Sequence, residues 1–280
     1  MTRLIKLPLA QNVGPLQRVT VRCPLGVTYN KFYFFLGGNI TASLVSNIVL
    51  KVNGQERFRW KTFAHLQSRN AYNVATAAAQ AFVMDFTNRF AKDETAMTLA
   101  TYAATAEAGV QDMVIEFDLG SYTASATSIV TIRAEVDVPS ANRTILRNRY
   151  YQKVLAGAVE EQVIIPYGQN GEQLQRMYIF GTTSLIDNIR IRREGADEFE
   201  DMSVIDNEFI ARDMGKLPQA GMVCVDFIQN NLVAHMLNTA VLLGSDGKPR
   251  PIQNLDIRFR TSGAGTFDIY TESVCLNDRA

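Results

Sequence analysis

The stretch Phe82-Val83-Met84-Asp85-Phe86 returns 141 residues later as Val223-Cys224-Val225-Asp226-Phe227. Four further short matches keep the same order at offsets of 141 to 144 residues: Val21–Pro24 with Val163–Pro166, Phe34–Gly37 with Tyr178–Gly181, Ser46–Ile48 with Asp187–Ile189, and Gln111–Phe117 with Gln253–Phe259. One such match would mean little, but five in one order at a nearly constant offset indicate an internal repeat. The chain of 280 residues is therefore expected to form two domains of the same fold.

Both halves of the repeat are dominated by strand patterns. Asn53-Gly54 between two alternating runs is typical of a tight hairpin, because both residues of its turn need a positive φ. At the same place the second half has Glu194–Asp197, for which we expect a longer loop. The predicted strands are Gln17–Cys23, Phe32–Leu36, Ile48–Val52, Glu56–Trp60, Ala81–Phe86, Met97–Tyr102, Met113–Leu119, Ile129–Val136, Ile189–Arg193, Met222–Phe227, His235–Leu243, Leu255–Arg260 and Phe267–Val274.

Each half also has one polar connection near its middle, at Thr62–Ala79 and Asp201–Lys216. We expect short helices there, the second with Asp201 or Ser203 as its N-cap. Strands and helices do not alternate regularly, so a parallel βαβ sheet is excluded as the main architecture. The prediction is an all-β fold of two tandem eight-stranded jelly-roll sandwiches with short helices in connecting segments, in domains 1–140 and 141–280 joined by a basic linker at about 138–153.

The composition is that of an ordinary globular protein, with 47% hydrophobic and 20% charged residues. Lys+Arg and Asp+Glu both number 28, whereas a nucleic-acid-binding protein usually has a basic excess, so we expect no direct sequence-specific binding to nucleic acid. The opening Met1–Gln11 lacks the apolar stretch of a signal peptide. The three cysteines, Cys23, Cys224 and Cys275, are expected to be reduced thiols of a protein that folds inside the cell.

The sequence offers no catalytic, cofactor-binding or metal-binding residues. A metal-dependent jelly-roll enzyme needs clustered histidines, but the only two are His65, expected in a helical connection, and His235, expected in a strand with its hydrogen bond satisfied. Asp85 and Asp226 occupy matching places in the repeat. We expect them at an edge or outward-facing strand position, and a cation site there is the alternative.

Several segments of the first half carry a resemblance to a known family: Leu7-Pro8, Asn12-Val13-Gly14, Pro24–Lys31, Leu36-Gly37-Gly38, Ile48–Gly54 and Asn70-Ala71-Tyr72. Over about residues 1–90 the chain resembles the double-jelly-roll major capsid proteins of tailless, internal-membrane-containing icosahedral dsDNA phages, the corticovirus-type coat protein and its prophage relatives. Beyond that stretch the repeat extends the same architecture to the second half.

The resemblance implies a structural major capsid protein that self-assembles. The expected particle is a homotrimeric, pseudo-hexameric capsomer that tiles an icosahedral shell around a membrane and a dsDNA genome. Its implied partners are further copies of itself, a penton or vertex protein, minor membrane proteins of the virion and the internal membrane lipids. Its implied location is the virion capsid, after folding and assembly in the bacterial host cytoplasm.

Two sets of charged residues are candidates for contacts between subunits. The basic set is Arg143, Arg147, Arg149 and Lys153, and the acidic set is Glu194, Asp197, Glu198 and Glu200. We expect the two sets to meet across subunits and fix the register of the capsomer, the alternative being solvated faces. Arg3 and Lys6, on a terminus expected to be mobile, are candidates for contact with anionic lipid headgroups.

The alternative function is a tandem jelly-roll carbohydrate- or receptor-binding protein, such as a spike. A sugar site needs exposed aromatic side chains beside carboxylates or amides. Trp60 is the only tryptophan and is placed in a hairpin strand, which argues against such a site. An enzyme ranks third, because the chain lacks a set of metal or catalytic ligands.

Overall fold

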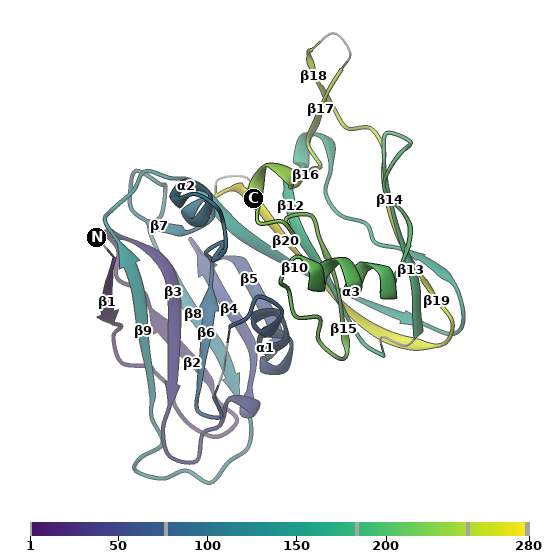
Figure 1. The fold of residues 1–280 in the computed structure, drawn as a ribbon. Helices are drawn as coiled ribbons and strands as arrows, with labels where there is room; N and C mark the ends of the chain where they lie inside the picture. The colour runs from purple at the N-terminus through teal and green to yellow at the C-terminus, as the bar shows by residue number, and fades with distance from the viewer. Residues whose placement is uncertain (1, 76–77, 183–184, 245–246, 278–280) are drawn as a thin grey trace. The chain divides into compact units, whose positions relative to one another are not determined.

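The computed structural model describes residues 2–75, 78–182, 185–244 and 247–277, and strands make up most of it (Figure 1). The chain divides into two compact units. The first comprises the chain up to Arg149 and the segment that begins at Cys275. The second comprises Tyr150–Val274. The predicted all-β class is confirmed.

Two sheets form the first unit. The larger has the strand order β1-β9-β3-β6, with β7 also pairing with β3, and the smaller has the order β2-β8-β4-β5. The bounds are β1 (Arg3–Lys6), β2 (Arg18–Arg22), β3 (Val27–Leu36), β4 (Val45–Val52), β5 (Gln55–Thr62), β6 (Ala81–Asp85), β7 (Tyr102–Ala104), β8 (Met113–Leu119) and β9 (Val130–Asp137).

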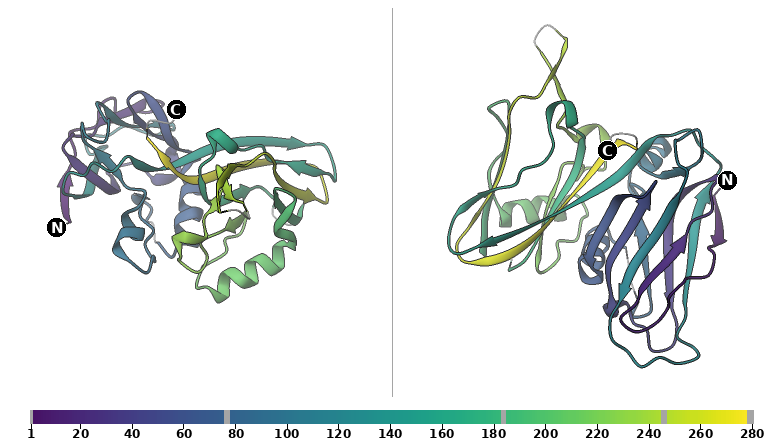
Figure 2. Two further views of the ribbon diagram at one scale, coloured as in Figure 1. Left: turned by 90° about the horizontal axis from the view of Figure 1, so that it is seen from above. Right: turned by 180° about the vertical axis from the view of Figure 1, so that it is seen from behind.

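The second unit repeats this arrangement with the orders β10-β20-β12-β15 and β11-β19-β13-β14. Its long strands β10 and β20 run side by side in both views of Figure 2, and the small hairpin β17–β18 projects beyond the sheets. The bounds are β10 (Thr144–Leu155), β11 (Glu160–Gln162), β12 (Gln173–Phe180), β13 (Ile186–Arg193), β14 (Ala196–Ser203), β15 (Met222–Asp226), β16 (Leu237–Asn238), β17 (Val241–Leu243), β18 (Pro249–Pro251), β19 (Leu255–Thr261) and β20 (Gly265–Leu276).

The two units share one topology. When the short β7, β16, β17 and β18 are set aside, the principal strands of each unit are paired in the orders 1-8-3-6 and 2-7-4-5 along the chain. Two four-stranded sheets connected in this way form a jelly roll. The five sequence matches fall on or directly beside corresponding strands of the two rolls, so the repeat reflects two copies of the same fold.

Two of the helices lie in the predicted connections between the fifth and sixth principal strands. They are α1 (Phe63–Tyr72) in the first roll and α3 (Val204–Asp213) in the second. Thr62 caps α1 and Ser203 caps α3, each hydroxyl accepting a backbone N–H from the first helical turn. Among the described residues, 3₁₀ turns lie at Ala42–Leu44, Gly168–Asn170 and Val233–His235.

Both rolls use the same hairpin turn between their fourth and fifth strands. Asn53 and Gly54 have φ values of 52° and 76°, and Glu194 and Gly195 have φ values of 53° and 81°. Arg193 pairs directly with Ala196 across the second turn. The longer loop expected at Glu194–Asp197 is therefore wrong, because the glycine makes a two-residue turn accessible even after a glutamate.

Three other expectations need correction. The predicted strand Met97–Tyr102 contains part of α2 (Glu94–Thr98), which starts where the Asp93 carboxylate accepts the N–H of Ala96. The predicted strand His235–Leu243 is split into β16 and β17 after a 3₁₀ turn that contains His235. Most of the expected linker 138–153 is β10, a strand whose buried residues alternate in part with charged ones.

The cores of the two rolls differ in composition. In the first, Phe34 stacks on Phe82 with ring centroids 4.3 Å apart, and Phe117 meets Phe34 edge to face at 5.9 Å. The core of the second is largely aliphatic, with residues such as Ile189 and Ile269 fully buried. Each such side chain contributes about 1.5–3 kcal/mol by leaving water, so both rolls have a substantial core of their own.

Candidate functional site

Four polar side chains gather on the outer face of the larger sheet of the first roll. Lys31 and Tyr33 come from β3, Asp85 from β6 and Glu135 from β9, and they are neighbours in the strand register. The Lys31 Nζ lies 4.0 Å from Asp85 Oδ2 and 3.7 Å from Glu135 Oε1. The Tyr33 hydroxyl donates a hydrogen bond of 3.0 Å to Glu135. We call this set the first quartet.

The second roll has the same constellation at the same register positions. Arg176 and Tyr178 come from β12, Asp226 from β15 and Glu272 from β20. The Arg176 guanidinium lies 3.1 Å from Asp226 and 3.9 Å from Glu272, and the Tyr178 hydroxyl donates to Glu272 over 3.0 Å. This second quartet keeps every role of the first, with arginine in place of lysine.

The two quartets differ in their exposure to solvent. In the second, the side chains of Asp226 and Glu272 are fully buried and that of Arg176 is 6% exposed. In the first, the side chains of Lys31 and Glu135 retain 19% and 25% exposure. The face that carries the quartet is therefore closed in the second roll and partly open in the first.

The pKa values follow from these surroundings. Burial alone would lower the pKa of Arg176, but the Asp226 carboxylate, followed by Tyr178 and Glu272, holds it well above its usual value. In the open quartet, burial and then the hydrogen bond to Glu135 raise the pKa of Tyr33 to about 12. Arg176 therefore stays charged, and Tyr33 stays a hydrogen-bond donor.

The matching aspartates lie on edge strands, as expected, but they are not exposed. Asp85 is 7% and Asp226 2% exposed. Besides its cation, each accepts a backbone N–H two residues ahead, from Thr87 over 2.9 Å and from Ile228 over 3.0 Å. These contacts fix the end of the sixth principal strand. Among the described residues, no group of three or more His, Cys, Asp and Glu side chains could hold a metal ion.

The cation and the tyrosine of each quartet escaped the sequence comparison because of a register slip of one residue. The match of Phe34–Gly37 with Tyr178–Gly181 pairs Phe34 with Tyr178, whereas the strand register makes Tyr33 the counterpart of Tyr178. A slip of one residue exchanges the two faces of a strand. At the correct offset of 145, Lys31-Phe32-Tyr33 stands against Arg176-Met177-Tyr178, and the shared charged, apolar, tyrosine pattern is visible.

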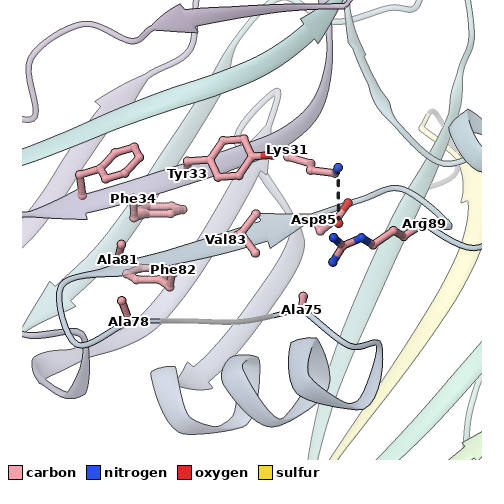
Figure 3. Close-up of a pocket in the computed structure, with 11 residues that line it drawn as sticks. Lys31, Tyr33, Phe34, Ala75, Ala78, Ala81, Phe82, Val83, Asp85 and Arg89 are labelled. Atoms are coloured by element: carbon pink, nitrogen blue, oxygen red, sulfur yellow. Dashed lines mark ion pairs between the residues drawn. The ribbon is translucent and has the colours of Figure 1, made fainter. Parts of the chain in front are cut away.

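A cavity of about 360 Å³ adjoins the first quartet. Figure 3 shows Lys31, Asp85 and Arg89 grouped at one end, and alanine and phenylalanine side chains at the other. Its lining is Lys31, Tyr33, Phe34, Phe35, Ala75, Ala78, Ala81, Phe82, Val83, Asp85 and Arg89. Phe35, on the same sheet face, is 44% exposed, so the apolar end is accessible from outside.

The helix α3 presents a second feature that the sequence did not single out. Its inner face is formed by Asn207 and Ala211, which are buried. On the opposite side, Ile205 is 80% and Phe209 72% exposed, and their spacing of four residues places them side by side. We call this pair the α3 stripe. The sequence predicted a helix in this connection, but it could not tell which face of the helix is exposed.

The predicted basic residues, Arg143, Arg147, Arg149 and Lys153, lie on β10 or just before it. Arg143 Nε donates to the carbonyl of Glu107 over 3.3 Å, and Lys153 Nζ forms an ion pair of 2.6 Å with Glu161. Two members of this set are therefore engaged inside the chain.

Arg147 and Arg149 belong to a cluster of arginines with the buried Arg57. Burial and then the positive charge of Arg147 lower the pKa of Arg57, whose guanidinium donates to the carbonyl of Asn277 over 2.6 Å. Arg147 and Arg149 are themselves half-buried. The cluster concentrates positive charge at this place on the first unit.

The predicted acidic residues Glu194, Asp197, Glu198 and Glu200 lie in the hairpin turn and on β14. Asp197 and Glu198 form ion pairs with Arg192 and Arg193 on the neighbouring strand β13. The Glu194 carboxylate accepts two backbone N–H groups of the turn before β19. Three of the four acidic residues therefore have partners within the second roll.

Arg3 and Lys6 do not lie on a free terminus. Both belong to β1, which pairs antiparallel with β9, with Arg3 opposite Val136 and Lys6 opposite Arg133. The expected mobility of this segment is wrong, because the ladder of backbone hydrogen bonds holds it as an edge strand. Both side chains are exposed.

Other predicted features have clear places in the structure. His65 lies in α1, as expected, and His235 Nδ1 is 2.9 Å from the side-chain nitrogen of Asn230. Trp60 is fully buried and offers no stacking surface to a sugar. Cys23, Cys224 and Cys275 are buried and form no disulfide bond. No helix in the described segments has the length and apolarity to cross a membrane.

Family models match nearly the whole chain. Residues 4–137 match the viral coat protein P2 N-terminal domain, and residues 145–276 match the viral coat protein P2 C-terminal domain. No curated protein matches the sequence. These matches cover one jelly roll each.

Solved structures show the same fold. The major capsid protein P2 from bacteriophage PM2 is similar with a TM-score of 0.84 and 18% identity, over 99% of this chain and 98% of that chain. The STIV MCP (Sulfolobus Turreted Icosahedral Virus) has a TM-score of 0.68 and 11% identity over 99% and 97%. The PBCV-1 virus capsid has a TM-score of 0.59 and 10% identity over 98% and 93%. With both halves matched to its domains, the chain belongs to the P2 family of viral coat proteins, and its role is structural rather than enzymatic.

Proposed function

We propose that this coat protein acts as a homotrimer whose six jelly rolls form a pseudo-hexameric capsomer. The observation that carries the proposal is the identical strand order of the two rolls, down to the matching quartets on their outer faces. A threefold axis repeats the pair of rolls three times, so one gene product supplies six similar sides. A head-to-tail contact that closes by rotation produces such a ring.

Light scattering coupled to size-exclusion chromatography tests this assembly. A trimer has a mass of about 94 kDa, three times the 31.2 kDa of one chain. A protein that stays monomeric over the accessible concentration range, or that forms dimers, contradicts the proposal. Fold controls by circular dichroism accompany each sample, so that a misfolded preparation is not counted as a monomer.

Further assembly of the capsomers is part of the same proposal. We infer that they tile an icosahedral shell around a membrane and a dsDNA genome, together with a vertex protein and minor membrane proteins. Assembly would take place in the cytoplasm of a bacterial host. The overall resemblance of the fold to the PM2 capsid protein supports this picture.

Two charged surfaces of the chain suit roles in the assembly. The arginine cluster around Arg147 and Arg149 on one copy would attract carboxylates such as Glu200 on a neighbour. Arg3 and Lys6, on the edge strand β1, would add weak attraction to anionic lipid, about 1 kcal/mol per charge. Repetition over many copies in a shell would make that contribution useful.

A further inference from the structure

The open outer face of the first roll is an incomplete version of a face that is closed in the second. Both faces carry a quartet in the same register. In the second roll the surrounding residues Gln175 and Tyr270 are buried as well, at 1% and 0% exposure. In the first roll Phe35 on this face is 44% exposed and the cavity lies beside it. We call this open face, with Lys31, Phe35, Val83 and Arg89, the β3–β6 socket.

The helices of the two rolls differ in the opposite sense, because large apolar side chains are buried on α1 and exposed on α3. In α1 the large apolar residues Phe63, Leu66 and Tyr72 are buried, and the exposed positions hold Ala64 and Gln67. In the corresponding helix α3 the exposed positions hold the α3 stripe, Ile205 and Phe209. Large apolar side chains at 80% and 72% exposure on a helix are a mark of an interaction surface.

The charges around the two surfaces are complementary. Three carboxylates flank the α3 stripe, those of Asp206, Glu208 and Asp213. Glu208 pairs with Arg212 over 3.0 Å, so Asp206 and Asp213 give this rim its net negative charge. At the rim of the socket, Arg89 and Arg133 are exposed cations, while the carboxylates of Asp85 and Glu135 are held by Lys31, Thr87 and Tyr33. The α3 stripe is thus an apolar surface with an acidic rim, and the β3–β6 socket is an apolar surface with a basic rim.

We propose that the α3 stripe of one copy docks into the β3–β6 socket of a second copy. Phe209 and Ile205 cover Phe35 and Val83, and the acidic rim of α3 meets Arg89 and Arg133. Stripe and socket belong to different rolls, so the contact is head-to-tail and each copy offers one of each. The inference rests on the proposed trimer, in which three such contacts close the ring.

Disulfide trapping tests the docking directly in the full-length chain. Phe35→Cys and Phe209→Cys are introduced together, and the protein is oxidised mildly after the trimer has been isolated. The native Cys23, Cys224 and Cys275 are buried, so they offer no exposed thiol. A covalent trimer that stops at three chains on a non-reducing gel is the expected product. Each single variant should remain uncrosslinked.

A matched control uses the helix of the first roll. Gln67→Cys combined with Phe35→Cys places a thiol at an exposed position of α1 and should give no covalent trimer. Trimers of correct mass that form no disulfide between positions 35 and 209 would overturn the docking and leave the trimer intact. A ladder that continues beyond three chains would overturn the closed ring. A wild-type monomer would remove the trimer and the docking together.

A second measurement uses substitutions that leave the folded core untouched. Ile205→Ser with Phe209→Ser should raise the concentration at which the trimer half-dissociates roughly tenfold or more, because central apolar anchors dominate the affinity of interfaces. Gln67→Ser is the control and should not change it. An unchanged dissociation midpoint in the double variant, with its melting temperature preserved, would contradict the proposal.

Discussion

The guanidinium of Arg176 and the carboxylate of Asp226 lie 3.1 Å apart across strands β12 and β15, and both side chains are buried. Their approach is oblique, so the contact is an ion pair without a well-aligned hydrogen bond. Since Glu272 lies on the other side of Arg176, one cation compensates two buried carboxylates. Removing that cation would take its positive charge away from both buried carboxylates.

The variant Arg176→Met should therefore lose about 3–5 kcal/mol of unfolding free energy, the usual result of breaking a buried ion pair from one side. Lys31→Met in the half-open first quartet is the matched control and should lose about 1 kcal/mol, because solvent screens that pair. Urea unfolding of the two variants measures the difference. Equal losses would show that burial does not distinguish the quartets.

The pH dependence of stability should include a contribution from Glu116. Burial would raise the pKa of this carboxyl, but hydrogen bonds from Lys51 at 2.9 Å and Arg18 at 2.8 Å hold it below the usual 4.5. A pKa lowered by folding adds stability that is present above pH 4.5 and lost as the pH falls through the folded-state value. Glu116→Gln should therefore be less stable than the wild type at pH 7, with the gap closing in acid.

Melting temperatures of both proteins between pH 7 and pH 3 check this expectation. Glu56→Gln serves as the control, because its carboxylate is 41% exposed and 3.6 Å from Arg59. That variant should follow the wild-type curve closely. A gap between wild type and Glu116→Gln that stays constant with pH would contradict the assigned ion pair.

The two hairpin turns should respond alike to a lost glycine. Gly54 and Gly195 have φ values of 76° and 81°, and no atom lies within 4 Å of a Cβ added at either position. Each substitution by alanine should therefore cost about 1–2 kcal/mol from backbone strain alone. Gly157→Ala, at a site that is also open but lacks a positive φ, should be nearly neutral. A large loss at only one of the two turns would show that their geometries differ.

Charge reversal of the arginine cluster should act on assembly more than on folding. Arg147→Glu with Arg149→Glu replaces attraction to neighbouring carboxylates by repulsion, so capsomers should fail to associate into shells. The melting temperature of the isolated chain serves as the folding control, since losing the positive charge of Arg147 also removes its repulsion of the buried Arg57. Shells of normal yield from this variant, seen by electron microscopy, would exclude the cluster from the lattice contacts.

The sequence predicted the architecture because the repeat is supported by five separate matches and the strand alternation recurs along both halves. Asn53-Gly54 predicts its hairpin correctly, whereas Glu194-Gly195 does not indicate a tight turn, because a glutamate with positive φ is unusual. Similarly, the basic residues of β10 suggested a linker. Their spacing is compatible with a strand that has one solvent-exposed face. Only the pairing of β10 with β20 shows that this segment is a strand.

The quartets could not be predicted from either half alone. Lys31 and Glu135 are ordinary charged residues in the sequence, and they meet only because β3 and β9 pair in one register. The burial of the second quartet could not be predicted from the sequence either. Asp226 and Asp85 have the same local sequence context, but their partner cations differ in exposure. Exposure of Phe209 on α3 is likewise a tertiary property that no local pattern encodes.

Electron cryomicroscopy of the purified oligomer tests the central claim most directly. The account predicts a particle with threefold symmetry in which six similar jelly-roll densities surround the axis, two from each chain. The densities should alternate between the first and second rolls. A twofold dimer, or a trimer whose second rolls lie outside a ring of three first rolls, would contradict it.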